Sequence, residues 1–260
     1  MHFSLEIHQK SYTADLSQPV SLALPLQPDG KNPNCYYAEA PQAEVIRADN
    51  FVGSVAAGGT VNYQRLHLTP HGNGTHTECV GHITSEAIYL PDCLRDVFIP
   101  TQVISVQPQS RSGDQVIRKE DIAAQLSTPA LPGLAVRTLP STEDKAERQY
   151  SGSNPPYFDE DVGSYLAEIG VFHLLTDLPS VDKEADGGAL RVHRGFWRYP
   201  EEVRLSATIT ELIFVPDFLS DGMYLLNLQV PRILLDAVPS QPVVFAVQPE
   251  VKKDTKRAKS

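Results

Sequence analysis

Short runs of Val, Ile and Leu recur along the chain, separated by polar stretches that contain Gly and Pro. Their length of four to eight residues is typical of β-strands. The runs are SLEI (4–7), VSLAL (20–24), VNYQRLHL (61–68), QVISV (102–106), LAVRT (134–138), VFHLL (171–175), ITELIFV (209–215), MYLLNL (223–228) and PVVFAV (242–247). We expect a strand at each.

Three segments between these runs are typical of helices. The clearest is 158–170, where acids occupy the first turn and a glycine stands at the C-terminal cap. Further helices are expected over 118–126 and 189–197. Because strands outnumber helices and do not alternate strictly with them, the sequence predicts an α/β fold with a mixed sheet in a single domain, residues 1–249.

Composition and charge narrow the classes of partner. The net charge of −10 argues against binding nucleic acid, which draws its affinity from a basic surface, so a small-molecule partner is favoured. The chain shows neither a run of about twenty apolar residues, which a membrane span requires, nor a signal peptide. We therefore expect a cytoplasmic protein that does not enter membranes. The basic, polar residues 250–260 are expected to form a disordered tail.

The three cysteines, Cys35, Cys79 and Cys93, are an odd number without CxxC spacing. This pattern argues against a disulfide framework and against a thiolate zinc site. Cys79 is interpreted as a packing residue rather than a nucleophile.

The segment HGNGTHTECVGH, residues 71–82, holds three of the eight histidines of the chain and one glutamate. In an extended segment His76 and Glu78 point to the same face and can converge on one ion. The neighbouring glycines favour a loop here instead. Mixed nitrogen and oxygen ligands suit Zn²⁺ or Mn²⁺, and the segment therefore predicts a site for a divalent metal.

A metal at such a site can lower the pKa of a bound water and polarise a carbonyl, so hydrolysis is the favoured chemistry. A histidine that is not a ligand can then move the proton. The chain contains no G-x-S-x-G, H-E-x-x-H, G-x-G-x-x-G or P-loop motif. Serine hydrolases, zincins and nucleotide-dependent enzymes are therefore disfavoured.

Other candidates lie outside this segment. Glu211 stands in an apolar run, where a carboxylate is costly unless it is paired or binds a metal, so it is interpreted as a ligand. His193 shares a helical face with Leu190 and Trp197, which leaves both a core role and a site role open. Asp177 and Ser180 follow a strand end and are predicted to bind substrate; for Asp177 the alternative is to cap a turn. His67 and His173 are interpreted as structural.

Several of these motifs resemble one family. GTHTECVGH resembles the H-x-G-T-H-x-D-x-P-x-H signature of the cyclase family of metal-dependent hydrolases, which includes bacterial kynurenine formamidases and isatin hydrolases. The similarity runs from about residue 14 to 248. Further matches, in family order, are VRT (136–138), TDLPSVD (176–182), His193, ITELIFVPDFLSDGMYLLNLQV (from 209) and DAVPSQPV (from 236).

The resemblance implies a swivelling β/β/α fold, a homodimer and one or two divalent ions, Zn or Mn. It makes His82 the catalytic acid/base. The residues that it implies as metal ligands are His76, Glu78, His193 and Glu211. The first signature histidine should stand at position 72, but Gly72 is there, and His71 is one position away. Whether His71 takes that ligand's place is open.

Two further departures are visible. Glu78 and Val80 replace the aspartate and proline of the signature, and the separation between His193 and Glu211 is longer than in the kynurenine formamidases. These differences leave the hydrolase class standing but weaken the assignment of one substrate.

The favoured function is an arylformamidase-like hydrolysis of N-formylkynurenine to kynurenine and formate, a step of tryptophan catabolism. In this hypothesis a metal-bound hydroxide attacks the carbonyl and His82 protonates the departing nitrogen. The alternatives are hydrolysis of another cyclic amide such as isatin, a metal-dependent lyase or dehydratase, and a non-catalytic protein that binds metal or a small ligand.

Overall fold

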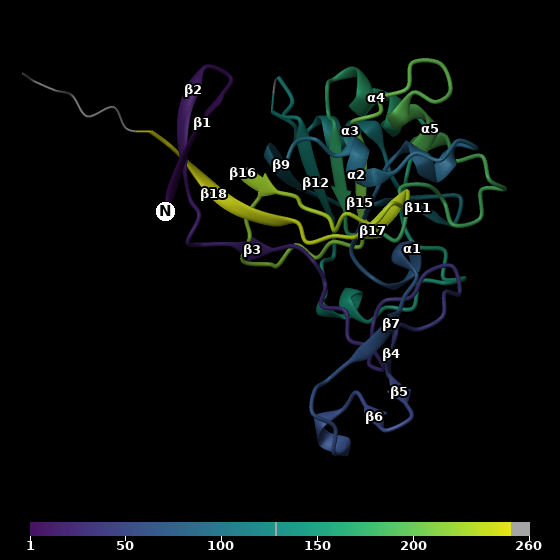
Figure 1. The fold of residues 1–260 in the computed structure, drawn as a ribbon. Coiled ribbons are helices and arrows are strands. Elements are labelled where there is room, and N and C mark those ends of the chain that lie inside the picture. Colours follow the sequence, from purple (N-terminus) through teal and green to yellow (C-terminus); the bar gives the residue numbers. More distant parts are fainter. Residues whose placement is uncertain (128, 251–260) are drawn as a thin grey trace, which may run out of the picture.

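The computed structural model describes residues 1–127 and 129–250, and most of its strands form one mixed sheet (Figure 1). In spatial order the strands of this sheet are β1 (His2–Ile7), β2 (Lys10–Asp15), β18 (Val243–Pro249), β16 (Gly222–Asn227), β9 (Phe98–Val106), β12 (Gly133–Thr138), β14 (His173–Thr176), β15 (Thr208–Glu211), β8 (His76–Glu78) and β17 (Ala237–Pro239), and β3 (Val20–Ser21) also pairs with β18. The predicted tail, residues 250–260, lies outside the described residues except for its first position.

The centre of the sheet is parallel and its flanks are antiparallel. Strands β9, β12, β14 and β15 run parallel to one another, whereas β16 and β18 on one side and β8 and β17 on the other pair antiparallel. This arrangement confirms the predicted α/β class with a mixed sheet.

Both faces of the central strands are buried, because residues alternate between two hydrophobic clusters. In β12, for example, Leu134 and Val136 face one cluster and Ala135 faces the other. The first cluster is covered by three helices: α3 (Lys119–Ala123), α4 (Val162–Glu168) and α5 (Arg191–Trp197). These helices appear in the three predicted segments, but each is shorter than expected.

The remaining helices are single turns: α1 (Pro70–Asn73), α2 (Leu90–Cys93), η1 (Val55–Ala57), η2 (Val80–Ile83) and η3 (Glu143–Ala146). The sequence does not predict these turns, because four or fewer residues show no helical period. Within the described parts of the chain, no helix has the length and apolar character that crossing a membrane requires.

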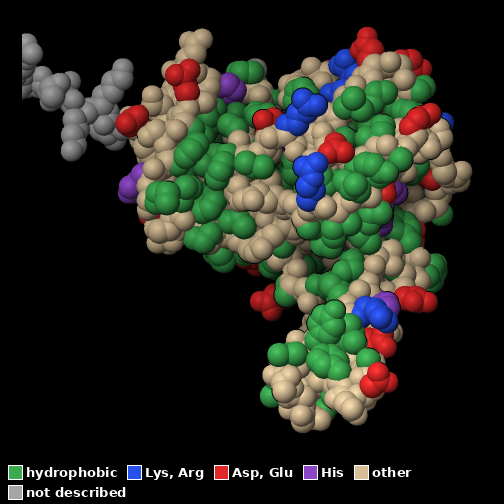
Figure 2. All heavy atoms as spheres, in the orientation of Figure 1, with side chains coloured by type: hydrophobic (Ala, Val, Ile, Leu, Met, Phe, Trp, Pro, Cys, Tyr) green, Lys and Arg blue, Asp and Glu red, His purple; other side chains and the backbone are tan. Residues whose placement is uncertain are grey.

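Smaller sheets flank the main one. Strands β10 (Gln109–Arg111), β11 (Asp114–Ile117) and β13 (Tyr157–Phe158) form one. Two further pairs, β4 (Gln42–Val45) with β7 (Gln64–His67) and β5 (Arg47–Ala48) with β6 (Phe51–Val52), form an arm, residues 42–67, that projects from the body (Figures 1 and 2). Hydrophobic side chains gather on this arm, and its base leads through β7 into α1.

All nine predicted strand segments contain strand residues, although the segment at 20–24 forms only the two-residue β3. The expectation of a loop around His76 was wrong: residues 76–78 form β8, which is paired on both sides, with β15 and with β17. We expected a loop because of Gly72, Gly74 and Gly81, but these glycines lie outside the strand, two before it and one after it.

Candidate metal centre

The candidate site begins with the pairing of β8 and β15. His76 lies directly opposite Glu211 in this antiparallel pair, and Glu78 lies opposite Ile209. Strand alternation therefore places His76, Glu78 and Glu211 on one face of the sheet, as the spacing of His76 and Glu78 predicts for an extended segment. On the opposite face the hydroxyl groups of Thr77 and Thr210 are 2.8 Å apart and hydrogen-bonded, which holds the two strands in register.

The His76 side chain is oriented by the backbone. Its Nδ1 lies 3.0 Å from the carbonyl oxygen of Gly74, so Nδ1 carries the proton and donates a hydrogen bond to this oxygen. The unprotonated Nε2 then points into the site, 3.4 Å from Oε2 of Glu211. Glu211 is itself fixed, because its Oε1 accepts a hydrogen bond of 3.0 Å from the backbone of Val181.

His193 enters the same cluster from α5. Its Nδ1 lies 2.6 Å from Oδ2 of Asp182, and its Nε2 lies 3.0 Å from Oε1 of Glu78. Asp182 also accepts hydrogen bonds from the backbone N–H groups of Val192 and His193. It therefore fixes both the start of α5 and the histidine ring, in the way that a carboxylate orients a metal-binding histidine.

The carboxylates of the cluster favour the protonated, positively charged form of the neighbouring histidines. Burial lowers the pKa of His193, but its pairing with Asp182 and Glu78 outweighs burial and raises the pKa to about 10. Burial likewise raises the pKa of Glu78, but His82, His193 and His71 hold this pKa well below its usual range. In the described part of the chain, every ion pair made by Glu78 and Glu211 is with a histidine.

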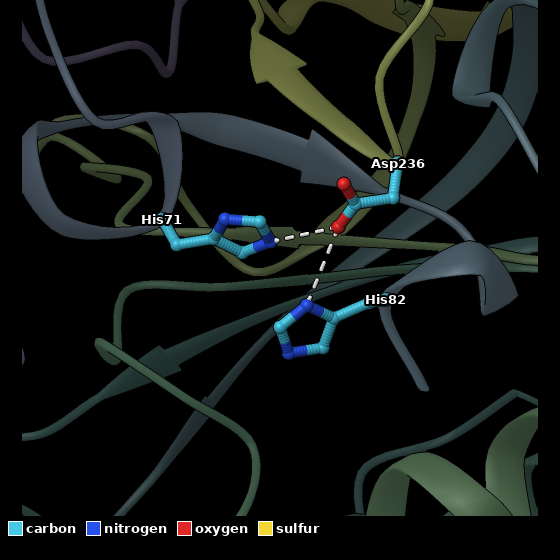
Figure 3. A group of neighbouring side chains, drawn as sticks. All are labelled: His71, His82 and Asp236. Carbon is cyan, nitrogen blue, oxygen red and sulfur yellow. Dashed lines mark ion pairs between the residues drawn. The ribbon is translucent and has the colours of Figure 1, made fainter. Parts of the chain in front are cut away.

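A third group of side chains lies at the exposed side of the cluster (Figure 3). Oδ2 of Asp236 lies 3.3 Å from Nε2 of His71 and 3.4 Å from Nδ1 of His82. Burial lowers the pKa of His71, but pairing with Asp236 and Glu78 raises it to about 10. Contacts with His71 and His82 hold the pKa of Asp236 far below its usual range.

Unpartnered atoms test whether these residues fit a metal ion. Four buried side-chain polar atoms in residues 1–127 and 129–250 have no hydrogen-bond partner, and three of them are Nε2 of His71, Nε2 of His76 and Oε2 of Glu78. Leaving buried polar atoms unpaired is costly, and the three atoms belong to ligand types that bind Zn²⁺ and Mn²⁺. The donor set therefore fits a divalent cation.

The structure brings together His71, His76, Glu78, His82, His193 and Glu211, the six residues predicted for metal binding and catalysis. Their ligand atoms form three groups: His71 with His82 and Asp236, Glu78 with His82 and His193, and His76 with Glu78 and Glu211. Asp236 and Asp182 were not predicted from the sequence as site residues. The signal for Asp182 was present, because it closes the TDLPSVD segment and follows a buried strand.

Of the two residues predicted to bind substrate, Asp177 is engaged with other side chains, whereas Ser180 is hydrogen-bonded to Asp182, which holds His193. The Asp177 carboxylate is buried, accepts hydrogen bonds from Thr138 and forms an ion pair of 2.7 Å with Lys145. The hydroxyl of Ser180 accepts a hydrogen bond from the backbone of Asp182. The structure does not bring Asp177 to the cluster, and for both residues a role in binding substrate stays a prediction.

The other histidines interpreted as structural lie away from the cluster. His173 is buried with Nδ1 2.9 Å from the hydroxyl of Thr208, whereas His67 is exposed on the arm, 3.5 Å from Glu44. Cys79 is buried in an apolar cluster with Leu90 and Val238, in agreement with a packing role.

Comparisons with known proteins agree with this architecture. Residues 14–183 match the model of a family described as "Putative cyclase". A search of curated proteins finds no match. Among solved structures, a "potential metal-dependent hydrolase with cyclase activity" is 18% identical at a TM-score of 0.63, over 89% of this chain and 99% of that chain.

Two further structures share the fold. A "predicted metal-dependent hydrolase" from Bacillus stearothermophilus is 18% identical at a TM-score of 0.59, over 88% of this chain and 98% of that chain. Isatin hydrolase A from Labrenzia aggregata, bound to benzyl benzoate, is 17% identical at a TM-score of 0.62, over 88% and 93%.

Proposed function

The chain belongs to the cyclase family, and on this premise we propose that it is a metal-dependent hydrolase of a small amide. The observation that carries the proposal is the pair of unpartnered buried atoms, Nε2 of His76 and Oε2 of Glu78, which point into one cluster of histidines and carboxylates. N-formylkynurenine is the first substrate to test, with kynurenine and formate as products.

The proposed ligands of the ion, Zn²⁺ or Mn²⁺, are His76, Glu78, Glu211, His193 and His71. A divalent ion bound there lowers the pKa of a coordinated water and polarises the amide carbonyl. Asp182 keeps the His193 ring in place, and the backbone of Gly74 keeps His76 in the tautomer whose Nε2 is free.

His82 is the proposed acid/base. Hydrolysis adds water to the carbonyl carbon and breaks the C–N bond, and the departing nitrogen needs one proton. The His82 side chain is 30% exposed and can therefore meet a substrate, unlike the fully buried His76. Its Nδ1 faces Asp236, and Figure 3 shows its other ring nitrogen pointing away from that carboxylate. That nitrogen is the one available to transfer the proton.

The test is the rate of N-formylkynurenine hydrolysis by the purified chain with Zn²⁺ or Mn²⁺, repeated with excess chelator. We expect turnover with at least one ion and its loss with the chelator. Glu78→Gln, which removes a buried carboxylate charge at nearly constant shape, should be inactive under all conditions. Tight metal binding without turnover of any amide would instead favour a non-catalytic binding protein.

A cyclic amide is the second candidate, because isatin hydrolases are among the structures that share the fold. The same residues can serve ring opening, in which the carbonyl and the leaving nitrogen stay in one product. Parallel assays with isatin and N-formylkynurenine distinguish the two substrates, and the higher kcat/KM identifies the better one.

A further inference from the structure

Position 72 cannot carry a side chain in this fold. A Cβ atom at Gly72 would lie 2.4 Å from the Cβ of Ala38 and 3.1 Å from the carbonyl oxygen of Cys35. The turn at residues 35–38 is held against this position, because the backbone N–H of Cys35 donates a hydrogen bond of 3.0 Å to the carbonyl of Gly72. The histidine that reaches the site from this segment is therefore His71.

The neighbours of His71 differ from those of His76. Its Nε2 lies 3.4 Å from Oε2 of Glu78 and 3.3 Å from Oδ2 of Asp236. In a tetrahedral zinc site with bonds of 2.0–2.1 Å, ligand atoms are roughly 3.3–3.4 Å apart. These two separations therefore match those between atoms that share one ion.

The backbone places Asp236 beside Glu78. Asp236 directly precedes β17, whose Ala237 pairs with Glu78 of β8. The carbonyl of Asp236 also accepts a hydrogen bond of 3.0 Å from the N–H of Cys79. Asp236 is thus fixed by the same strand that carries the candidate ligands.

We propose that Asp236 is a metal ligand of this chain, and that its carboxylate binds the divalent ion together with His71 and Glu78. The inference rests on the proposed function in one respect, that the cluster binds metal. Two unpartnered atoms support it: the buried Nε2 of His71, which lies next to Asp236, and Oε2 of Glu78, which lies next to the same Nε2 and whose side chain is 1% exposed, both lack a hydrogen-bond partner.

The competing role for Asp236 is to position His82. In that case the carboxylate only orients the ring through Nδ1, and its loss slows turnover without changing metal affinity. Affinity for the ion, measured without substrate, therefore separates a ligand from a positioning residue.

The experiment compares Zn²⁺ affinity of the metal-free full chain and of Asp236→Asn by competition with a chromophoric chelator at pH 7. We expect the variant to bind Zn²⁺ about 100-fold more weakly. Even residues that only hydrogen-bond to a metal ligand contribute about 10- to 100-fold to metal affinity, and the loss of a ligand should reach the upper end of this range. Asp92→Asn is the matched control, because Asp92 is an exposed carboxylate paired with Arg232 and should leave affinity unchanged. An Asp236→Asn affinity within twofold of the parent overturns the proposal.

A second variant keeps the test decisive if Asp236→Asn does not fold. Asp236→Cys replaces the oxygen donor with a thiolate, which prefers Zn²⁺ to Mn²⁺. If Asp236 is a ligand, the ratio of Zn²⁺ to Mn²⁺ affinity should rise at least tenfold, and an unchanged ratio contradicts this role. Failure of the parent chain to bind either ion would instead remove the proposed function itself.

Discussion

At the scale of single residues, the proposed ligands and the proposed acid/base differ in how deeply their side chains are buried. His76 and His193 are almost completely buried, whereas His82 is close to the same carboxylates but reaches the surface. A buried imidazole with a fixed tautomer suits metal binding, and an accessible one suits proton transfer to a substrate.

Replacement of His82 tests this separation. His82→Ala should retain bound metal but lose at least about 100-fold in kcat, because the leaving nitrogen then lacks its proton donor. The measurement combines metal content with steady-state hydrolysis of the best amide substrate. His67→Ala, on the exposed arm, is the control and should keep both properties. Wild-type turnover in His82→Ala would show that another group supplies the proton.

His173 gives the protein a pH-dependent stability. Burial lowers its pKa to about 4 from the ordinary value of 6.5. Between these values the unfolded chain binds a proton that the folded chain does not, so folding stability falls as pH drops from about 6.5 to about 4. For His173→Asn, we expect the loss of unfolding free energy between pH 7 and pH 5 to be smaller by about 2 kcal/mol.

Urea denaturation at the two pH values measures this difference. Because the site histidines are present in both proteins, their own pH dependence cancels in the comparison. His2→Asn, on the exposed first strand, should behave like the parent. An equal pH dependence in His173→Asn and the parent would mean that His173 accepts a proton in the folded chain.

The candidate site was predictable where ligands are close in sequence or stand in unusual surroundings. His76, Glu78 and His82 form a short motif, and Glu211 is an acid in an apolar run. Asp236 opens the DAVPSQPV match to the family, but nothing in the sequence marks this one carboxylate before a short strand as a ligand. Only the pairing of β17 with β8 brings it to the site. Asp177 is the opposite case. Its place after a strand suggested a site residue, but its carboxylate pairs with Lys145, which is distant in sequence.

At the scale of elements, the position of His193 depends on how closely α5 packs on α4. A Cβ atom at Gly163 would lie 2.1 Å from the carbonyl oxygen of Val192, so the two helices can approach only because residue 163 is glycine. The neighbour of Val192 in α5 is the candidate ligand His193. Helix packing and ligand geometry are therefore linked.

Gly163→Ala should separate the helices. We expect a loss of about 1–3 kcal/mol in unfolding free energy from overpacking, and weaker metal binding because His193 moves with α5. Chemical denaturation and metal titration measure the two effects. Glu168→Ala, an exposed position on the same helix, should change neither. If Gly163→Ala retained full stability, the close approach of the helices would not limit this position.

The elements themselves were predictable to different degrees. Long apolar runs gave the central strands, since burial on both faces requires continuous Val, Ile and Leu. Strand β8 was not predictable, because it has three residues, all of them polar, and its pairing partners lie more than a hundred residues further along the chain. The helices proved shorter than the predicted segments; Phe158, the first residue of the segment 158–170, belongs to strand β13 instead.

At the scale of the whole molecule, the fold brings side chains from five separated segments into one cluster that is rich in carboxylates. The segments are residues 71–82, Asp182, His193, Glu211 and Asp236. Residues 71–82 supply His71, His76 and Glu78, whereas the candidate ligands His193, Glu211 and Asp236 come from three other segments. The complete centre therefore depends on the global fold, and local sequence patterns predict only parts of it.

The homodimer implied by the family resemblance stays a prediction at this scale. Sedimentation equilibrium should give a mass twice that of the chain. Exposed apolar side chains on the arm, such as Val61, Tyr63 and Leu66, are consistent with association. A mass equal to the single chain at micromolar concentration would contradict it.

The most direct test of the account is the metal content of the purified chain after exposure to Zn²⁺ or Mn²⁺ and extensive dialysis, measured by elemental mass spectrometry beside Glu78→Gln. Glu78 contacts His71, His82 and His193, so its charge is central to the cluster. We expect about one or more tightly held ions per chain in the parent and the loss of most of this metal in the variant. A parent without metal, or a variant that retains as much as the parent, would contradict a metal centre at this site.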